Sequence, residues 1–134
     1  RMWLLPTNFN RSSTTVLNTI KKTINPRLLD MADDMYQAIS LQDNQAMLEI
    51  VREGWVLKKS SSGIILGNND LVTCDNLLES KDYVLAHRLI GAGNGGYFLI
   101  FTNKDTEKSV IEKDLGKTVL SVSIDYNGIK TQRM

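Results

Sequence analysis

The stretch "YVLAHRLIGAGNGGYFLIFT", residues 83–102, decides how the fold is built. Two runs rich in aliphatic and aromatic residues, 83–90 and 97–102, flank six residues that hold four of the chain's nine glycines. Such runs predict two strands joined by a glycine-rich loop. The second run is apolar on both faces, so we expect it to lie in the middle of its sheet.

The glycine loop itself, "GAGNGG" at residues 91–96, formally matches the G-x-G-x-x-G pattern of dinucleotide-binding folds. In those folds the loop opens a helix that holds the pyrophosphate, whereas here a strand follows. Protein kinases do place such a loop between strands, but none of their later motifs follows in this chain. A structural hairpin stays open as an alternative, although a tight turn needs only one or two glycines. Four glycines in six residues leave the backbone without side chains, which indicates that another surface or a ligand approaches it closely.

Outward from this hairpin, hydrophobic spacing predicts a strand near residues 2–6, four helices between residues 12 and 80, and a fifth helix ended by Gly116. The second helix follows Pro26 and carries apolar residues at helical spacing, namely Leu28, Ala32, Met35, Tyr36 and Ile39. A closing strand alternates, with four residues expected to face inward: Leu120, Val122, Ile124 and Tyr126. This order predicts an α+β domain with a small, mostly antiparallel sheet and helices packed on one face.

The composition is that of an ordinary globular domain. The 134 residues, 42% apolar and 23% charged, suffice for one domain, and the net charge of +1 creates no field that attracts nucleic acid or anionic membranes. The single cysteine, Cys74, excludes an internal disulfide, and one histidine with one cysteine makes a structural zinc site improbable. We therefore expect a single, cytoplasmic, metal-free domain over residues 1–134, with no nucleic-acid or membrane partner.

At the glycine loop the sequence resembles the GHMP kinases, which include galactokinase, homoserine kinase and mevalonate kinase. "LIGAGNGGYFLIF", residues 89–101, is similar to the third motif of that family. Three other stretches resemble the family in its own order: "LLPTNFNRSSTTVL" (4–17), "EGWVLKKSSSGI" (53–64) and "LSVSIDYNGIK" (120–130). The closest resemblance is to sugar kinases of the D-glycero-D-manno-heptose 7-phosphate kinase type, and it touches nearly the whole chain.

The resemblance implies a ferredoxin-like C-terminal domain of an ATP-dependent kinase that phosphorylates a hydroxyl of a sugar or sugar phosphate. In the family, a separate N-terminal domain carries the "P-x-x-x-G-L-G-S-S" phosphate loop and the acidic residues associated with magnesium. ATP and Mg²⁺ therefore belong to the intact enzyme, and this chain alone is expected to bind neither and to transfer no phosphate. Its expected partners are that N-terminal domain and the sugar substrate. Weak self-association is expected through the face that the domain would cover.

The resemblance also assigns candidate site residues. The glycine loop is expected to line the ATP and phosphate cleft with Gly91, Ala92, Gly93, Asn94, Gly95 and Gly96. Bare backbone N–H groups suit this task, because phosphoryl transfer depends on positioning and charge stabilisation. Arg11 and Ser12 are expected to face a substrate phosphate at a helix N-terminus, and Lys58 to add positive charge. For Arg11 an exposed cap, and for Lys58 a solvated helix face, remain the alternatives. No catalytic residue or metal ligand is expected within this chain.

Two other residues, His87 and Trp55, are expected to have structural roles. Strand alternation places His87 opposite Arg88 and favours a structural histidine, and Trp55 suits the core. Arg88 keeps the positive charge that precedes the loop in the family.

Two further hypotheses stay open beside the kinase. One is a stand-alone, non-catalytic small-ligand-binding or regulatory α+β module, which would bind without turnover. The other is a subunit of a split kinase.

Overall fold

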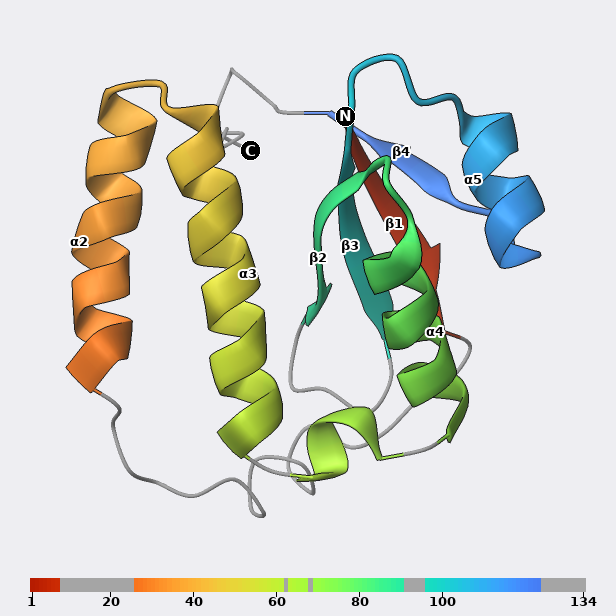
Figure 1. The fold of residues 1–134 in the computed structure, drawn as a ribbon, viewed down its shortest axis with the longest axis horizontal. Helices are drawn as coiled ribbons and strands as arrows, with labels where there is room; N and C mark the ends of the chain where they lie inside the picture. The colour runs from red at the N-terminus through yellow and green to blue at the C-terminus, as the bar shows by residue number, and fades with distance from the viewer. Residues whose placement is uncertain (8–25, 62, 68, 91–95, 124–134) are drawn as a thin grey trace, which may run out of the picture.

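The computed structural model describes residues 1–7, 26–61, 63–67, 69–90 and 96–123. Its elements, in chain order, are β1 (Met2–Pro6), α2 (Pro26–Ser40), α3 (Asn44–Ser61), the 3₁₀ helix η1 (Gly63–Leu66), α4 (Asn69–Ser80), β2 (Val84–Ile90), β3 (Tyr97–Thr102), α5 (Lys108–Leu115) and β4 (Leu120–Val122). Figure 1 shows the α+β arrangement that the sequence predicts. The first predicted helix, which begins near residue 12, lies outside the described residues.

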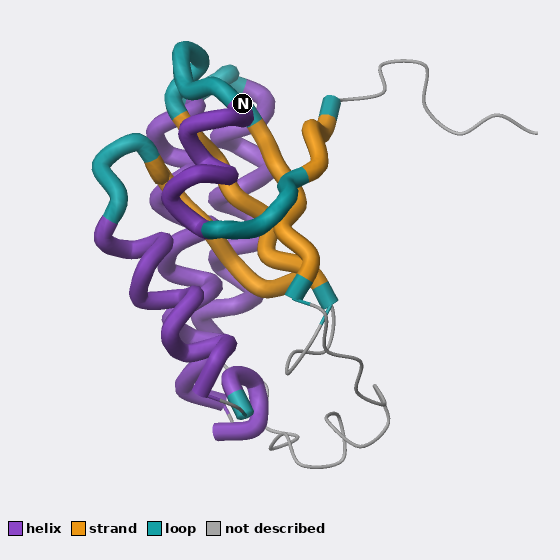
Figure 2. Tube along the Cα trace, turned by 90° about the vertical axis from the view of Figure 1, so that its right-hand side faces the viewer, coloured by secondary structure: helices purple, strands orange, loops and turns teal. Residues whose placement is uncertain are grey.

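The four strands form one antiparallel sheet in the order β2-β3-β1-β4. β3 has a neighbour on each side, as its two-sided apolar sequence predicts. Phe98 and Ile100 of β3 are fully buried on one face, while Leu99 and Phe101 are partly covered on the other. Seen from the side, the strands form one layer with most of the helical turns gathered on one side of it (Figure 2). The prediction of a central β3 is therefore confirmed.

The core lies between the helix-covered face of the sheet and the helices. The Trp55 indole meets the Phe98 ring edge-on, with ring centroids 6.3 Å apart and an interplanar angle of 88°. Burying side chains of this kind contributes roughly 1.5–3 kcal/mol each before the entropy cost of ordering them. The buried cluster consists of Trp3, Leu5, Trp55, Ile65, Leu71, Leu78, Leu89, Phe98, Ile100, Ile111 and Val119. Among the described residues, no helix is long and apolar enough to cross a membrane.

Most of the apolar residues that the spacing singles out on α2 are exposed. α2 packs against α3, and its buried residues are Met31 and Ala38, two turns apart on one side of the helix. The predicted row lies further round the helix, where Tyr36 is 74% exposed and Ile39 is 58% exposed. The spacing thus predicts the helix correctly but not the face that α3 covers. We call the exposed set the α2 apolar row; it comprises Leu28, Leu29, Tyr36 and Ile39.

The inward orientation predicted for Leu120 is wrong. Leu120 is 49% exposed, because it pairs with Leu4 on the face of the sheet that is turned away from the core. The preceding residue, Val119, is fully buried instead, and its N–H donates to Glu112 Oε2 at 2.9 Å. Val122 pairs with Met2 on the same outer face, so its predicted inward orientation is also wrong, although its side chain is partly covered. Ile124 and Tyr126 lie outside the described residues.

α5 ends at Gly116, as predicted. Gly116 adopts the left-handed conformation with φ +65° and ψ +23°, and its N–H donates to the Glu112 carbonyl at 2.8 Å. A Cβ built at this position would meet no heavy atom within 4 Å, so only backbone strain opposes a larger residue.

We predict that Gly116→Ala lowers the free energy of unfolding by about 1 kcal/mol, because alanine is strained at positive φ. Gly116→Asn is expected to lose less, since asparagine tolerates this conformation. Urea denaturation of the three proteins measures both differences. Equal stability of the Ala variant and the parent would contradict the assignment of this helix end.

Candidate functional site

The elements that flank the glycine loop converge at one end of the molecule, the lower end in Figure 1. There β1 and β2 end, β3 begins, α3 reaches its C-terminus and α4 starts. Residues 91–95 of the loop lie outside the described residues, as do Arg11 and Ser12. The predicted site residues that the structure does describe are Gly96, which directly precedes β3, and Lys58, which lies in the last turn of α3, so both lie toward this end. We call this region the loop end.

Gly96 closes the glycine loop under a specific backbone constraint. Its φ is +87°, a conformation that favours glycine, and a Cβ here would lie 3.6 Å from the Ile90 carbonyl oxygen. Its own carbonyl accepts two hydrogen bonds from the buried Thr7, one from the backbone N–H at 2.9 Å and one from Oγ1 at 2.8 Å. The end of β1 therefore fixes where the loop re-enters β3.

Two cations, Lys58 of α3 and Arg88 of β2, lie near enough to each other before the loop for their charges to interact. Burial, and secondarily the charge of Arg88, lower the pKa of Lys58 to about 8. Burial also lowers the pKa of Arg88, whose Nε is buried with no hydrogen-bond partner among the described residues. The guanidinium lies next to Gly54 of α3, where a Cβ would be in ordinary van der Waals contact with Arg88 Nη1 at 3.9 Å.

This pair of cations suits an anionic ligand. Two like charges in a partly dry environment destabilise each other, and an anion between them relieves both the repulsion and the lost hydration. Phosphate is a favourable partner, because guanidinium and ammonium groups donate charge-assisted hydrogen bonds to it. The sequence predicted Lys58, whereas the position of Arg88 beside it became evident only from the packing of α3 against β2.

A hollow of about 400 Å³ adjoins the loop end between α4 and the C-terminus of α5. Thr7, Asp70 and Lys117 are among the residues that line it, together with Cys74. Burial raises the pKa of the half-buried Cys74 thiol, so this side chain stays protonated near neutral pH and is a weak nucleophile. The hollow thus offers polar groups but no activated thiol.

The sequence did not predict the hydrogen-bonded, buried carboxylate of Asp75 in α4. Asp75 as a residue is 5% exposed, and its carboxylate accepts hydrogen bonds from Trp55 Nε1 at 2.8 Å and Lys59 Nζ at 3.0 Å and contacts His87 Nε2 at 2.7 Å. Burial acts to raise the pKa of Asp75, but these hydrogen bonds outweigh it and lower the pKa to about 2. One signal was present, since Asp75 lies between Leu71 and Leu78 on the buried side of its helix. We call Asp75, Trp55, Lys59 and His87 the Asp75 cluster.

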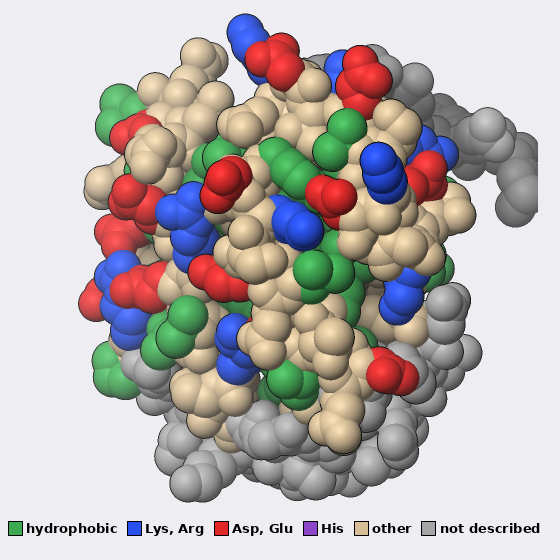
Figure 3. All heavy atoms as spheres, turned by 45° about the vertical axis from the view of Figure 1, so that its right-hand side comes forward, with side chains coloured by type: hydrophobic (Ala, Val, Ile, Leu, Met, Phe, Trp, Pro, Cys, Tyr) green, Lys and Arg blue, Asp and Glu red, His purple; other side chains and the backbone are tan. Residues whose placement is uncertain are grey.

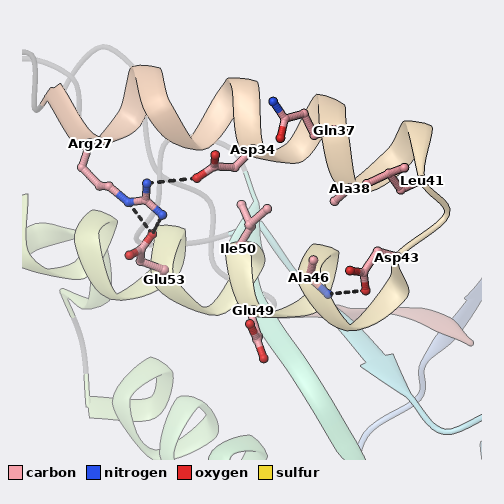
Figure 4. Close-up of a pocket in the computed structure, with 10 residues that line it drawn as sticks. All are labelled: Arg27, Asp34, Gln37, Ala38, Leu41, Asp43, Ala46, Glu49, Ile50 and Glu53. Carbon is pink, nitrogen blue, oxygen red and sulfur yellow. Dashed lines mark hydrogen bonds and ion pairs between the residues drawn. The ribbon is translucent and has the colours of Figure 1, made fainter.

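A separate groove of about 430 Å³ runs between α2 and α3 (Figure 4). Arg27 of α2 binds Asp34 on the same helix at 3.0 Å and reaches across the groove to bind Glu53 of α3 at 2.8 Å. Asp43 and Glu49 add further carboxylates to its lining. A groove with this excess of negative charge repels phosphate, and none of the predicted site residues lines it.

Charges elsewhere on the described surface are mixed. On the face shown in Figure 3, acidic and basic side chains are interspersed, with small separate apolar spots between them. Within the described ranges, no group of three or more His, Cys, Asp or Glu side chains is placed to hold a metal ion.

Searches against protein-family models and against curated proteins found no match to this chain. The family resemblance therefore depends on the sequence motifs themselves, and the function must be inferred from those motifs together with the geometry of the loop end.

We predict that anion binding at the loop end weakens as pH rises. The pKa of Lys58 is near 8, so its charge is largely present at pH 7 and largely lost at pH 9. Affinity for sulfate, which stays a dianion throughout, should fall about tenfold across this range as Lys58 deprotonates. NMR titration of the chain with sulfate at constant ionic strength measures this change.

Two variants make the pH experiment specific. Lys58→Gln should bind weakly with no pH dependence, and Lys104→Gln, which alters an exposed lysine after β3, should behave like the parent. Affinity that stays constant from pH 7 to pH 9 in the parent would show that Lys58 does not hold the anion.

Proposed function

We propose that this chain is the C-terminal, substrate-binding domain of a cytoplasmic, ATP-dependent kinase of the GHMP type. Its substrate is a sugar or sugar phosphate, and a heptose phosphate fits the closest resemblance. The observation that carries the proposal is the meeting of Lys58, Arg88 and both flanks of the glycine loop at one end of the fold. The single free thiol, Cys74, accords with a reducing compartment.

Phosphoryl transfer asks little covalent chemistry of the protein and much electrostatic positioning. In the proposed enzyme, Lys58 and Arg88 bind the anionic group of the sugar phosphate and orient the hydroxyl that is to be phosphorylated. The Thr7–Gly96 hydrogen bonds hold one end of the glycine loop, so the loop's backbone donors act from a fixed base. This role needs no side-chain base within the chain.

ATP and Mg²⁺ are assigned to the N-terminal domain that the resemblance implies. The described part of this chain supplies no carboxylate cluster for Mg²⁺, so its residues do not fit the metal. When bound in the intact enzyme, Mg²⁺ would neutralise charge on the phosphates.

Turnover of the complete native polypeptide that contains this chain tests the proposal. With ATP and a panel of sugars and sugar phosphates, ADP release should depend on one of these substrates. Lys58→Gln and Arg88→Gln should each raise KM for a sugar phosphate about tenfold, because each removes one charge-assisted contact. The matched variant Lys104→Gln should leave KM unchanged.

The possible results separate the hypotheses. A complete polypeptide that releases no ADP with any member of the panel would refute the kinase proposal. Saturable binding of a sugar phosphate without turnover would instead support a stand-alone binding module. Turnover that appears only after adding a separate polypeptide with the phosphate loop would support a split kinase.

The α2 apolar row is the surface that we propose for contact with the N-terminal domain. In the chain alone this row is exposed, and we predict that it causes weak self-association. The weight-average mass from sedimentation equilibrium should rise with protein concentration, and the double variant Tyr36→Ser, Ile39→Ser should abolish this rise.

Val110→Ser provides the control for this prediction, because Val110 is an exposed apolar residue on α5, away from α2. It should associate like the parent. A parent chain that remains monomeric at all concentrations would contradict the prediction.

A further inference from the structure

A second groove, of about 310 Å³, lies between α3, the C-terminal part of α4 and the first half of β2. Its volume is at the lower end of the range for small-molecule sites. It does not include Lys58 or Arg88, and so it is separate from the loop end. The lining residues are Arg52, Trp55, Val56, Lys59, Glu79, Val84, Leu85, Ala86 and His87.

Two cations of α3 border this groove. Arg52 and Lys59 are seven residues apart, which places them on the same side of the helix, two turns or roughly 10 Å apart. Arg52 Nε donates a hydrogen bond to the Leu85 carbonyl, which holds the guanidinium against β2. Its terminal nitrogens make no hydrogen bond to any described residue, so they remain available to a ligand.

Lys59 also keeps donor capacity. It gives one hydrogen bond to Asp75 at 3.0 Å and lies 5.3 Å from the centre of the Trp55 ring. An ammonium group has three donors, so two remain for a ligand. Its side chain is 33% exposed, while that of Asp75 is only 7% exposed, which indicates that the ammonium is open to the groove and its partner is not.

His87 contributes a buried imidazole to the same wall. Because Asp75 is ionised, His87 Nε2 is the donor in the contact with Asp75 at 2.7 Å. The other ring nitrogen, Nδ1, makes no contact with Asp75 and lies on the other side of the ring. Nδ1 lies 3.8 Å from Glu79 Oε2, too far for a hydrogen bond. Glu79 is largely exposed and lines the groove too, so the ring presents Nδ1 toward the lining of the groove.

The apolar part of the lining completes the chemistry. Val56, Val84 and Leu85, with the Trp55 indole, offer a surface to a carbon skeleton between the two cations. A buried ionic cluster stabilises a fold no better than apolar residues would, and here it stands beside an open groove. We propose that this groove is a second ligand site, which binds a small organic anion through Arg52 and Lys59 and packs its carbon skeleton on the apolar wall.

This proposal is independent of the kinase proposal, because it needs neither ATP nor the glycine loop. Titration of the whole chain with succinate and with inorganic phosphate, followed by NMR, tests it. The indole N–H signal of Trp55 and the imidazole nitrogens of His87 report on the groove. Both should shift saturably, and sodium chloride at equal ionic strength should not reproduce the shifts.

The two probes distinguish the chemical class. Tighter binding of succinate would identify a carboxylate ligand with a carbon skeleton, and tighter binding of phosphate would identify a phosphate ester. Arg52→Gln should weaken the binding of whichever probe binds more tightly by about tenfold. Because Arg52 is exposed, this variant should keep the fold. Lys104→Gln, which alters an exposed lysine outside both sites, should leave this affinity unchanged.

Three results would overturn the proposal. One is the absence of saturable shifts at Trp55 and His87 with either probe. Another is equal shifts with sodium chloride, which would indicate general screening. The third is binding that is lost in Lys58→Gln but retained in Arg52→Gln, because the anion would then occupy the loop end alone.

Discussion

The carboxylate of Asp75 is the constraint on which the arrangement of α3, α4 and β2 depends. A carboxylate that is 5% exposed is tolerated only when donors replace its hydration, and here each of the three donors comes from a different position on a neighbouring element. Trp55 and Lys59 come from α3, and His87 comes from β2. If either element moved away, a charge would be left buried and uncompensated. The cluster therefore fixes where α3 lies relative to the edge of the sheet.

The same constraint sets the loop end. Successive residues of a helix point about 100° apart, so turning Lys59 toward Asp75 turns Lys58 toward another side of α3. On β2 alternation has the same effect, since His87 faces the core and Arg88 faces away from it. Arg88 then reaches the stretch of α3 that holds Gly54 and Lys58. The meeting of the two cations follows from the way Asp75 holds the residues next to them.

Much of this architecture could be predicted from local sequence, and the exceptions have a common cause. The hairpin, the central place of β3 and the helix end at Gly116 depend on alternation, composition and a single glycine, all of which are local. The direction of the α2 apolar row and of Leu120 depends on which neighbour covers which face. Tertiary contacts determine which face is covered. For example, Met31 packs against Gly54, where a Cβ would lie only 3.3 Å from Met31 Cε. At the loop end, Lys58 is a residue that the sequence predicts. The Asp75 cluster was not predicted, because the groups that contact Asp75 come from other elements, α3 and β2.

Lys58 and Lys59 are adjacent in sequence but lie in different electrostatic surroundings. Lys59 lies 3.0 Å from a buried carboxylate, so its charge is compensated within the fold. Burial, and secondarily the charge of Arg88, lower the pKa of the Lys58 ammonium to about 8. For folding alone, a neutral side chain at either position would cost less than two half-buried cations. Under the proposed function, the anionic group of the substrate would offset the charge of both cations.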